Sequence, residues 1–340
     1  MRDPTEAPEP RAIPSGADVA LPSLPGPLDP EERSRLVTFL RARTRPVEPL
    51  PPPDLPEPFA SLSGRPLPRR PRALILDVYG TLLVSGAGEV GTAVDIGGPG
   101  PDGLAAVLEE FGVPGGADRF EEGLREEIRK EHERARAAGV PWPEVDGAAL
   151  LARLAGKTRP VAQVLGAARE AVLNPSAPMP GAEALLKAAR RAGLVLGIVS
   201  NAQYYTEPAL EAAFGRSLGA LGFSPDLCVW SWRLGRAKPD PELFRILARS
   251  LEVRGIEPES AVYVGNDLLN DVAPARACGY RTALFAGDAR SLRLRPGDPR
   301  TEGILPDTVL PSFHGAAAVF RLAGRDPFRC APRRPEEFPG

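Results

Sequence analysis

The stretch Ala73-Leu-Ile-Leu-Asp-Val-Tyr-Gly-Thr-Leu82 decides the fold class of this chain. It begins with a continuous apolar run, residues 73–76, which leads directly into Asp77 and a glycine turn. An apolar run without alternation indicates a strand buried on both faces, as in a parallel sheet with helices on both sides. We therefore expect Asp77 at the carboxyl end of a strand, where such sheets bind ligands.

Three further apolar runs follow along the chain. Residues 194–199 end at Ser200, residues 261–264 lie shortly before Asp267, and residues 281–285 close the series. Helical patterns fill the intervals, at residues 181–191, 241–251 and 272–279. The chain is thus predicted to be an α/β protein with a Rossmann-like parallel sheet flanked by helices. The polar residues that follow its strands should gather at one edge of the sheet.

A long insertion separates the first two strands. Its apolar spacing predicts helices at about residues 102–111, 117–138, 147–154 and 161–173. An all-helical insertion at this place is typical of a cap over an active site. We predict a catalytic core made of residues 71–84 and 180–324, with an inserted α-helical cap at residues 85–179.

The first 70 residues have a different composition, because they hold 17 of the 41 prolines. We expect a mostly disordered arm here, with one short helix that Asp29 caps and Pro30 begins. Residues 46–71 are typical of an extended polyproline-like linker. The Pro- and Arg-rich end of the chain, residues 325–340, is expected to be a flexible tail.

Composition excludes several classes of function. The chain has 340 residues, with 42 basic against 44 acidic side chains, so no charge excess favours nucleic acid or an anionic membrane. No apolar run is long enough for a membrane span. The three cysteines lie far apart, which argues against a disulfide framework or a zinc site. A soluble cytoplasmic protein is expected, and the 38 arginines against four lysines are typical of a GC-rich bacterial genome.

Three residues could act directly on a substrate. A carboxylate at the position of Asp77 can attack phosphorus or carbon, although an aspartate also suits a simple turn. Ser200 could donate to a phosphoryl oxygen or cap a helix. Lys238 is one of only four lysines, and its ammonium could offset negative charge that develops in the reaction.

Asp267 and Asp271 lie four residues apart in Gly265-Asn-Asp-Leu-Leu-Asn-Asp271. On a loop that opens a helix they face the same way, and with Asp77 they form an oxygen cluster that suits Mg²⁺. Helix capping by one of the two carboxylates is the alternative, and it would not need the second.

The order of these motifs resembles the haloacid dehalogenase (HAD) superfamily, subfamily I with a helical cap. The resemblance covers about residues 73–285 and implies that Asp77 is the nucleophile and forms an aspartyl ester. It also implies an Mg²⁺ site made of Asp77, the Tyr79 carbonyl and Asp267, with Asp271 supporting the metal or the catalytic lysine.

The same resemblance assigns residues around the phosphoryl group. Ser200 and Thr81 would bind or orient it, Asn201 would contact the substrate, and Lys238 would act beside the nucleophile. The expected substrate is a small phosphorylated metabolite, handled by a monomer or a homodimer.

One position departs from the phosphatases of this family. Most of them have an aspartate two residues after the nucleophile, as general acid and base, and this chain has Tyr79 there. The form Asp-x-Tyr-Gly-Thr-Leu resembles the metal-independent 2-haloacid dehalogenases. Those enzymes replace the first acid of the later motif, whereas Asp267 is kept, and they use an early cap arginine, whereas no Lys or Arg lies between Arg72 and Arg119.

We therefore expect a Mg²⁺-dependent phosphatase with altered acid–base groups. A metal-bound water or a cap carboxylate, Glu144 or Asp146, could replace the missing acid, or a good leaving group could make it unnecessary. The alternatives are a metal-independent dehalogenase and a binding protein that keeps the fold without catalysis.

Overall fold

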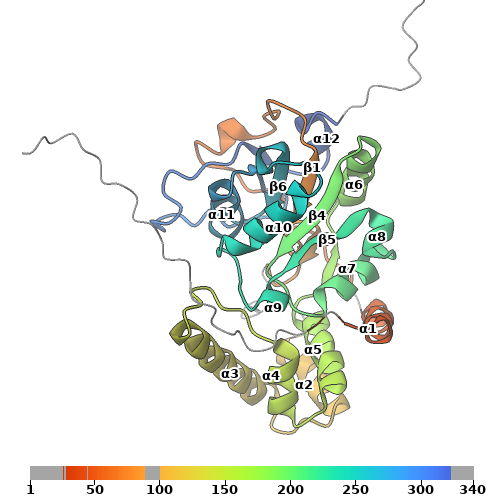
Figure 1. Ribbon diagram of the computed structural model, residues 1–340. Coiled ribbons are helices and arrows are strands. Elements are labelled where there is room, and N and C mark those ends of the chain that lie inside the picture. The colour runs from red at the N-terminus through yellow and green to blue at the C-terminus, as the bar shows by residue number, and fades with distance from the viewer. Residues whose placement is uncertain (1–25, 27, 44, 89–99, 323–340) are drawn as a thin grey trace, which may run out of the picture.

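The protein folds into an α/β core with a helical cap below it in the view of Figure 1. This computed structural model describes residues 26, 28–43, 45–88 and 100–322. The expected disorder before residue 26 and the expected flexible tail at 325–340 lie outside the described residues. No helix of the described part is long and apolar enough to cross a membrane.

The core contains a six-stranded sheet in which every neighbouring pair is parallel, in the order β5-β4-β1-β6-β7-β8. The four predicted strands form its centre: β1 (Ala73–Leu76), β4 (Val195–Ser200), β6 (Ala261–Gly265) and β7 (Arg281–Phe285). The edge strands β5 (Phe223–Trp230) and β8 (Thr308–Leu310) were not predicted. β5 contains Pro225 and Asp226, which a strand tolerates at a sheet edge but which hide its signal in the sequence.

Alternate residues of β1 enter two apolar layers, as the two-residue period of a strand requires. Leu74 and Leu76 belong to one cluster, and Ala73 and Ile75 to the other. The first layer is covered by α6 (Ala182–Arg191), α7 (Thr206–Phe214), α8 (Leu218–Leu221) and α12 (Ala316–Val319). The second is covered by α10 (Glu242–Glu252) and α11 (Ala273–Ala277). Both faces are buried, which explains the continuous apolar runs.

The cap rises from a short stem of two antiparallel strands, β2 (Leu83–Ser85) and β3 (Ser176–Pro178). Between them lie α2 (Gly100–Glu110), α3 (Ala117–Ala137), α4 (Gly147–Ala155) and α5 (Arg159–Leu173). These helices begin and end within two residues of the predicted bounds, and they share an apolar cluster of their own. The stem was not predicted, because three-residue strands leave no periodic signal.

The helix expected in the N-terminal arm is α1 (Pro30–Arg43). Asp29 caps it, since its Oδ1 accepts from the backbone N–H groups of Glu31 and Glu32 at 2.8 and 2.9 Å. Leu36 and Leu40 are buried, because α1 packs against both α5 of the cap and α7 of the core. Figure 1 shows α1 beside these two helices.

The segment that follows α1 differs from the expected linker, because it lies packed against the core. The Gly64 N–H donates to the Val309 carbonyl at 2.8 Å, and the Leu67 side chain is completely buried. Leu55 and Phe59 pack against an apolar cluster that includes Val309. The apolar residues between the prolines bury this segment, and part of it forms a 3₁₀ helix (Ala60–Leu62) instead of an extended chain.

Candidate active site

Asp77 lies at the carboxyl end of β1, in the centre of the sheet, as expected. Its backbone N–H donates to the Val264 carbonyl at 2.9 Å, so the neighbouring strand β6 fixes its position. The turn that follows needs Gly80, which has a φ of 77°. A Cβ at Gly80 would also lie 2.5 Å from the Ser291 Cβ. The sharp turn leaves the Asp77 carboxylate at the edge of the sheet.

Lys238 joins the predicted carboxylates. Its Nζ lies 2.7 Å from Asp77 Oδ1, 2.6 Å from Asp271 Oδ1 and 3.0 Å from the Tyr263 hydroxyl. Asn201 holds the lysine backbone on both sides, since its Oδ1 accepts from the Lys238 N–H at 2.7 Å and its Nδ2 donates to the Lys238 carbonyl at 3.2 Å. The structure therefore brings Asp77, Lys238 and Asp271 into one buried group.

Lys238 and Asp271 have shifted pKa values because they are buried beside each other. Burial lowers the pKa of Lys238, but the carboxylates of Asp271 and Asp77 raise it more, so its net pKa lies above the usual value. Burial raises the pKa of Asp271, and the Lys238 ammonium opposes that rise. The Lys238 ammonium and the Asp271 carboxylate are both charged at neutral pH, because Asp271 accepts hydrogen bonds from both the ammonium and the Tyr263 hydroxyl.

Gly265 allows Asp271 to reach the lysine. A Cβ at Gly265 would lie 2.3 Å from the Asp271 Cγ, so even an alanine there would displace this carboxylate. The second Asp271 oxygen accepts from the Asp267 backbone N–H at 2.9 Å. The sequence Gly265-Asn-Asp267 thus forms a tight turn around the Asp271 side chain.

Asp267 has different partners from Asp271. Its carboxylate caps the π-helical turn η3 (Leu268–Val272) by accepting from the backbone N–H groups of Leu269 and Asn270. Arg295 contacts both of its oxygens, with Nε 3.2 Å from Oδ1. Asp267 therefore caps a helical turn, which was the alternative to metal binding, and it also forms an ion pair with Arg295.

The expected Mg²⁺ does not fit this arrangement. Asp271 faces Lys238, and Asp267 faces Arg295, so each acid already has a cation. Among the described residues, no three His, Cys, Asp or Glu side chains are placed to hold a metal ion. The residue before Asp267 is an amide, Asn266, whose two ends bond to Thr81 Oγ1 at 3.1 Å and to the Ser291 carbonyl at 2.6 Å.

The other predicted site residues lie near this group in different ways. Thr81 is completely buried behind Asn266, and Ser200 is buried, with its Oγ donating to the Asn201 carbonyl at 3.2 Å. The Tyr79 hydroxyl lies 3.4 Å from Thr206 Oγ1. Burial, with a contribution from the Glu170 carboxylate, raises the pKa of Tyr79 far above the usual value for a phenol. Tyr79 therefore does not supply the missing general base.

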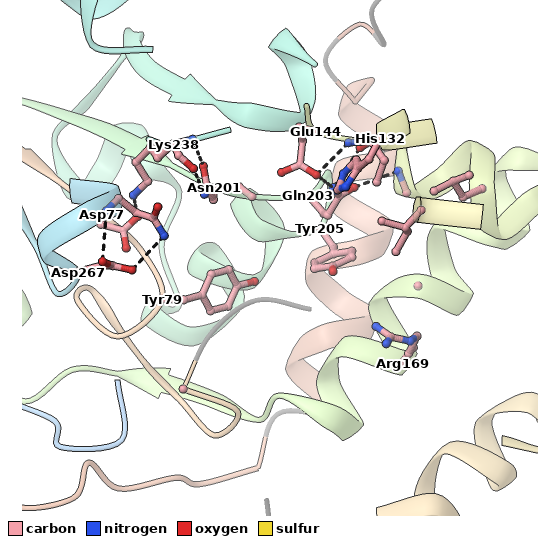
Figure 2. A pocket seen from close by; sticks show the side chains of 18 of the residues that line it. Asp77, Tyr79, His132, Glu144, Arg169, Asn201, Gln203, Tyr205, Lys238 and Asp267 are labelled. Atoms are coloured by element: carbon pink, nitrogen blue, oxygen red, sulfur yellow. Dashed lines mark hydrogen bonds and ion pairs between the residues drawn. The ribbon is translucent and has the colours of Figure 1, made fainter. Parts of the chain in front are cut away.

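A cavity of about 320 Å³ opens in front of Asp77 and extends beneath the cap. Figure 2 shows Asp77, Lys238 and Asp267 on one side of it and Glu144 and His132 on the other. We call these sides the core wall and the cap wall. The cap wall is largely apolar and is lined by Leu124, Ile128, Val145, Leu150 and Leu151.

Of the two cap carboxylates proposed as acids, only Glu144 lines this cavity. It accepts from Ser231 Oγ at 2.7 Å and from Gln203 Nε2 at 3.0 Å, and burial raises its pKa. Asp146 instead caps α4 by accepting from the Ala149 N–H, and it pairs with Arg159 at 2.8 Å. Glu144 thus connects the cap to the core at the edge of the cavity.

The comparison with protein families agrees with this geometry. The model of the haloacid dehalogenase-like hydrolases matches residues 71–279, which is more than half of the chain. The chain belongs to this family. The match contains β1, the cap, β6 and every side chain of the buried Asp77–Lys238–Asp271 group.

Two curated relatives match part of this haloacid dehalogenase-like hydrolase. Haloacid dehalogenase-like hydrolase domain-containing protein 3 of Bos taurus is 32% identical over 146 residues, which are 42% of this chain and 52% of that protein. A phosphoserine phosphatase of Thermus thermophilus is 38% identical over 120 residues, which are 35% of this chain and 43% of that protein. The chain thus spans about half the length of the curated relatives it matches.

Among solved structures, a 2-haloacid dehalogenase from Pseudomonas syringae pv. Tomato DC3000 aligns with 74% of this chain and 98% of its own chain. The identity is 19% and the TM-score is 0.48.

Three residues at the site of this haloacid dehalogenase-like hydrolase escaped the sequence analysis: Tyr263, Arg293 and Arg295. Tyr263 lies inside the apolar run of β6, where it is taken for a core residue. The sequence does contain a signal for the two arginines, because apolar and charged residues alternate in Leu292-Arg-Leu-Arg295 and such a pattern places the arginines on one face. The two leucines pack into an apolar cluster, Arg293 lines the cavity, and Arg295 contacts Asp267.

Proposed function

We propose that this haloacid dehalogenase-like hydrolase is a phosphatase that acts on a small phosphate ester through an aspartyl-phosphate at Asp77. The observation that carries the proposal is the placement of the Asp77 carboxylate, which lines the cavity and is held by Lys238 at 2.7 Å. Attack by a carboxylate divides a difficult hydrolysis into two easier steps.

In the first step an Asp77 oxygen bonds to phosphorus and the ester oxygen leaves with its carbon group. In the second, water attacks the same phosphorus and gives a proton to the Glu144 carboxylate that the first step leaves. The bond to Asp77 then breaks, which releases phosphate and restores the Asp77 carboxylate. The Lys238 ammonium stays beside the nucleophile and offsets the negative charge of the phosphoryl group. Its contact with Asp271 keeps it in place when Asp77 becomes an ester.

The leaving group needs a proton, and Tyr79 is unsuited to supply it. Glu144 is the group we propose for contact with the leaving group, because it lines the cavity on the cap wall and its raised pKa favours the protonated form. General acid–base catalysis contributes roughly 10²–10⁴-fold. The apolar neighbours of Glu144 favour a metabolite whose leaving group is partly apolar.

The names of relatives support a phosphorylated compound as substrate, and one of them names a phosphate ester. The Thermus thermophilus relative is a phosphoserine phosphatase, and a relative from Xenopus laevis is a phospholysine phosphohistidine inorganic pyrophosphate phosphatase that is 29% identical over 133 residues. The resemblance also predicts Mg²⁺, held by Asp77, Tyr79, Asp267 and Asp271. No step above depends on Mg²⁺, because Asp267 and Asp271 face cations of the chain itself.

A second candidate is metal-independent attack of Asp77 on carbon with loss of a halide. Two observations favour this reaction. Tyr79 stands two residues after Asp77, at the position where most phosphatases of the family have an aspartate. Arg293 lines the cavity, where its guanidinium could hold a substrate carboxylate. Arg293 of the core would then take the place of the early cap arginine that the dehalogenases use and that this chain lacks.

One experiment separates these reactions. Phosphate release from p-nitrophenyl phosphate and chloride release from 2-chloropropionate are measured with Mg²⁺ and with EDTA, beside Asp77→Asn. We expect phosphate release by the native protein at least about 10³-fold above the variant. Chloride release alone would replace the phosphatase with the second candidate. Equal rates in the native protein and Asp77→Asn would contradict both.

A further inference from the structure

A guanidinium covers the carboxylate of Asp267 that a divalent cation would need. Arg295 donates to both oxygens, Leu269 and Asn270 donate their backbone N–H groups to Oδ1, and the Asn270 amide donates to Oδ2 at 2.9 Å. A carboxylate offers about four lone-pair positions. The donors of the chain therefore already use the positions through which Asp267 could bind an ion.

The backbone holds Arg295 in an unfavourable conformation to make this contact. Its φ is 55°, in the left-handed region that favours glycine. Hydrogen bonds fix the loop on both sides: the Arg293 N–H donates to the Asn266 carbonyl at 2.9 Å, and the Asp298 N–H donates to the Arg295 carbonyl at 3.1 Å. Strain that the surroundings maintain is typical of residues whose position matters for function.

The charges of the site are nearly balanced without an added ion. Three carboxylates, Asp77, Asp267 and Asp271, face the two cations Lys238 and Arg295. An arginine stays protonated at every pH at which proteins fold, so it cannot make room by losing its charge. A divalent ion in contact with Asp267 would either repel this guanidinium or have to displace it.

We propose that Arg295 is a built-in replacement for the divalent cation at Asp267, so that this hydrolase works without a bound metal. Arg295 is a positioning residue here. It holds Asp267, whose backbone N–H in turn fixes Asp271 against Lys238. The inference rests on the proposed hydrolysis at Asp77 only for its activity measurement, because metal binding is measured separately.

Calorimetric titration with Mg²⁺ tests the proposal after treatment of the protein with EDTA and dialysis. We expect no saturable binding at millimolar Mg²⁺ by the native protein. Arg295→Ala should bind Mg²⁺ at least about tenfold more tightly, because it removes the repulsion between the Arg295 guanidinium and the ion. Arg249→Ala is the control, because it removes an exposed guanidinium on α10 that pairs with Glu242 instead. It should behave like the native protein.

A folded Arg295→Ala that gains no affinity for Mg²⁺ would overturn the proposal. If Arg295→Ala does not fold, Mg²⁺ binding is compared between the native protein and Asp267→Asn. Equally weak Mg²⁺ binding by both proteins supports the proposal. Tight Mg²⁺ binding by the native protein that is lost in Asp267→Asn overturns it. Turnover on either substrate should persist in EDTA. Turnover lost in EDTA and restored by Mg²⁺ would overturn this inference and leave the phosphatase intact. Absence of all turnover would count against the proposed function alone, with metal binding still deciding the inference.

Discussion

The core wall and the cap wall of the cavity are built in opposite ways. The core wall contains the ion pairs of Asp77, Lys238 and Asp267, and the Lys238 side chain is only 3% exposed. The cap wall has the apolar side chains of Leu124, Ile128, Leu150 and Leu151 from α3 and α4, together with His132, Glu144 and Arg169. The side chains on the core wall follow strands of one sheet, whereas those on the cap wall come from an insertion. Under the proposed function, the core wall would carry out the reaction and the cap wall would select the substrate.

The two walls are joined by a short segment next to Lys238. The Ala237 N–H donates to the Trp142 carbonyl at 2.8 Å, and the Glu144 N–H donates to the Gly235 carbonyl at 3.1 Å. Arg300 of the core also lies over the Trp142 ring, 5.6 Å from its centroid. Residues 142–144 of the cap are thus placed by the same backbone segment that leads to Lys238.

The largest effect is expected from removing the cation of the core wall. Lys238→Met leaves Asp77 and Asp271 as buried carboxylates without their ammonium, which costs about 3–5 kcal/mol of unfolding free energy. The midpoint of urea unfolding measures this loss. Lys187→Met is the control, because Lys187 is a surface lysine, 52% exposed in its side chain, and should change stability by at most about 0.5 kcal/mol. Similar losses in both variants would contradict the contrast between a buried and an exposed lysine.

A smaller effect, of a different kind, is expected on the cap wall. Ile128→Ala removes apolar contacts to the leaving group and should raise KM roughly tenfold, with kcat changed little. Steady-state kinetics on the best phosphate ester measures both constants. Glu122→Ala, at an exposed position of the same helix, should leave KM unchanged. A fall in kcat without a change in KM would place Ile128 in the chemistry and remove the distinction between the walls.

The smallest effect concerns Glu144 and depends on pH. Its folded pKa is raised by burial above the 4.5 of an exposed glutamate, so protonated Glu144 stabilises the fold below that pH. This contribution is lost as the pH rises through the folded pKa, when the buried carboxylate becomes charged. Thermal unfolding at about pH 5 and about pH 8 should therefore show Glu144→Gln gaining stability relative to the native protein at the higher pH. A difference that shrinks or reverses with rising pH would mean that the hydrogen bonds from Ser231 and Gln203 outweigh burial.

The sequence predicts the central strands and the cap helices because each has a strong local signal. Continuous apolar runs identify β1, β4, β6 and β7, and a period of about 3.6 residues identifies the cap helices. Polar residues directly after buried strands, such as Asp77, then indicate where a site forms. The three-residue strands and the edge strand with Pro225 lack such signals.

What the sequence does not predict comes from contacts between distant segments. Arg295 reaches Asp267 across 28 positions of the chain, through a backbone conformation that no sequence pattern requires of an arginine. The packed segment after α1 is a second example. Its prolines indicate an extended chain, but only the fold reveals a surface on which Leu67 can be buried.

Helix α1 connects the cap with the core. It packs on α5 and α7 together, and its Arg33 reaches Glu207 at 2.8 Å and Glu211 at 2.7 Å. Any opening that separates α5 from α7 must also expose Leu36 and Leu40 to water, so the free energy of that excursion includes their burial. An opening of the cap that separates α5 from α7 therefore has to break contacts that α1 makes with one of these helices.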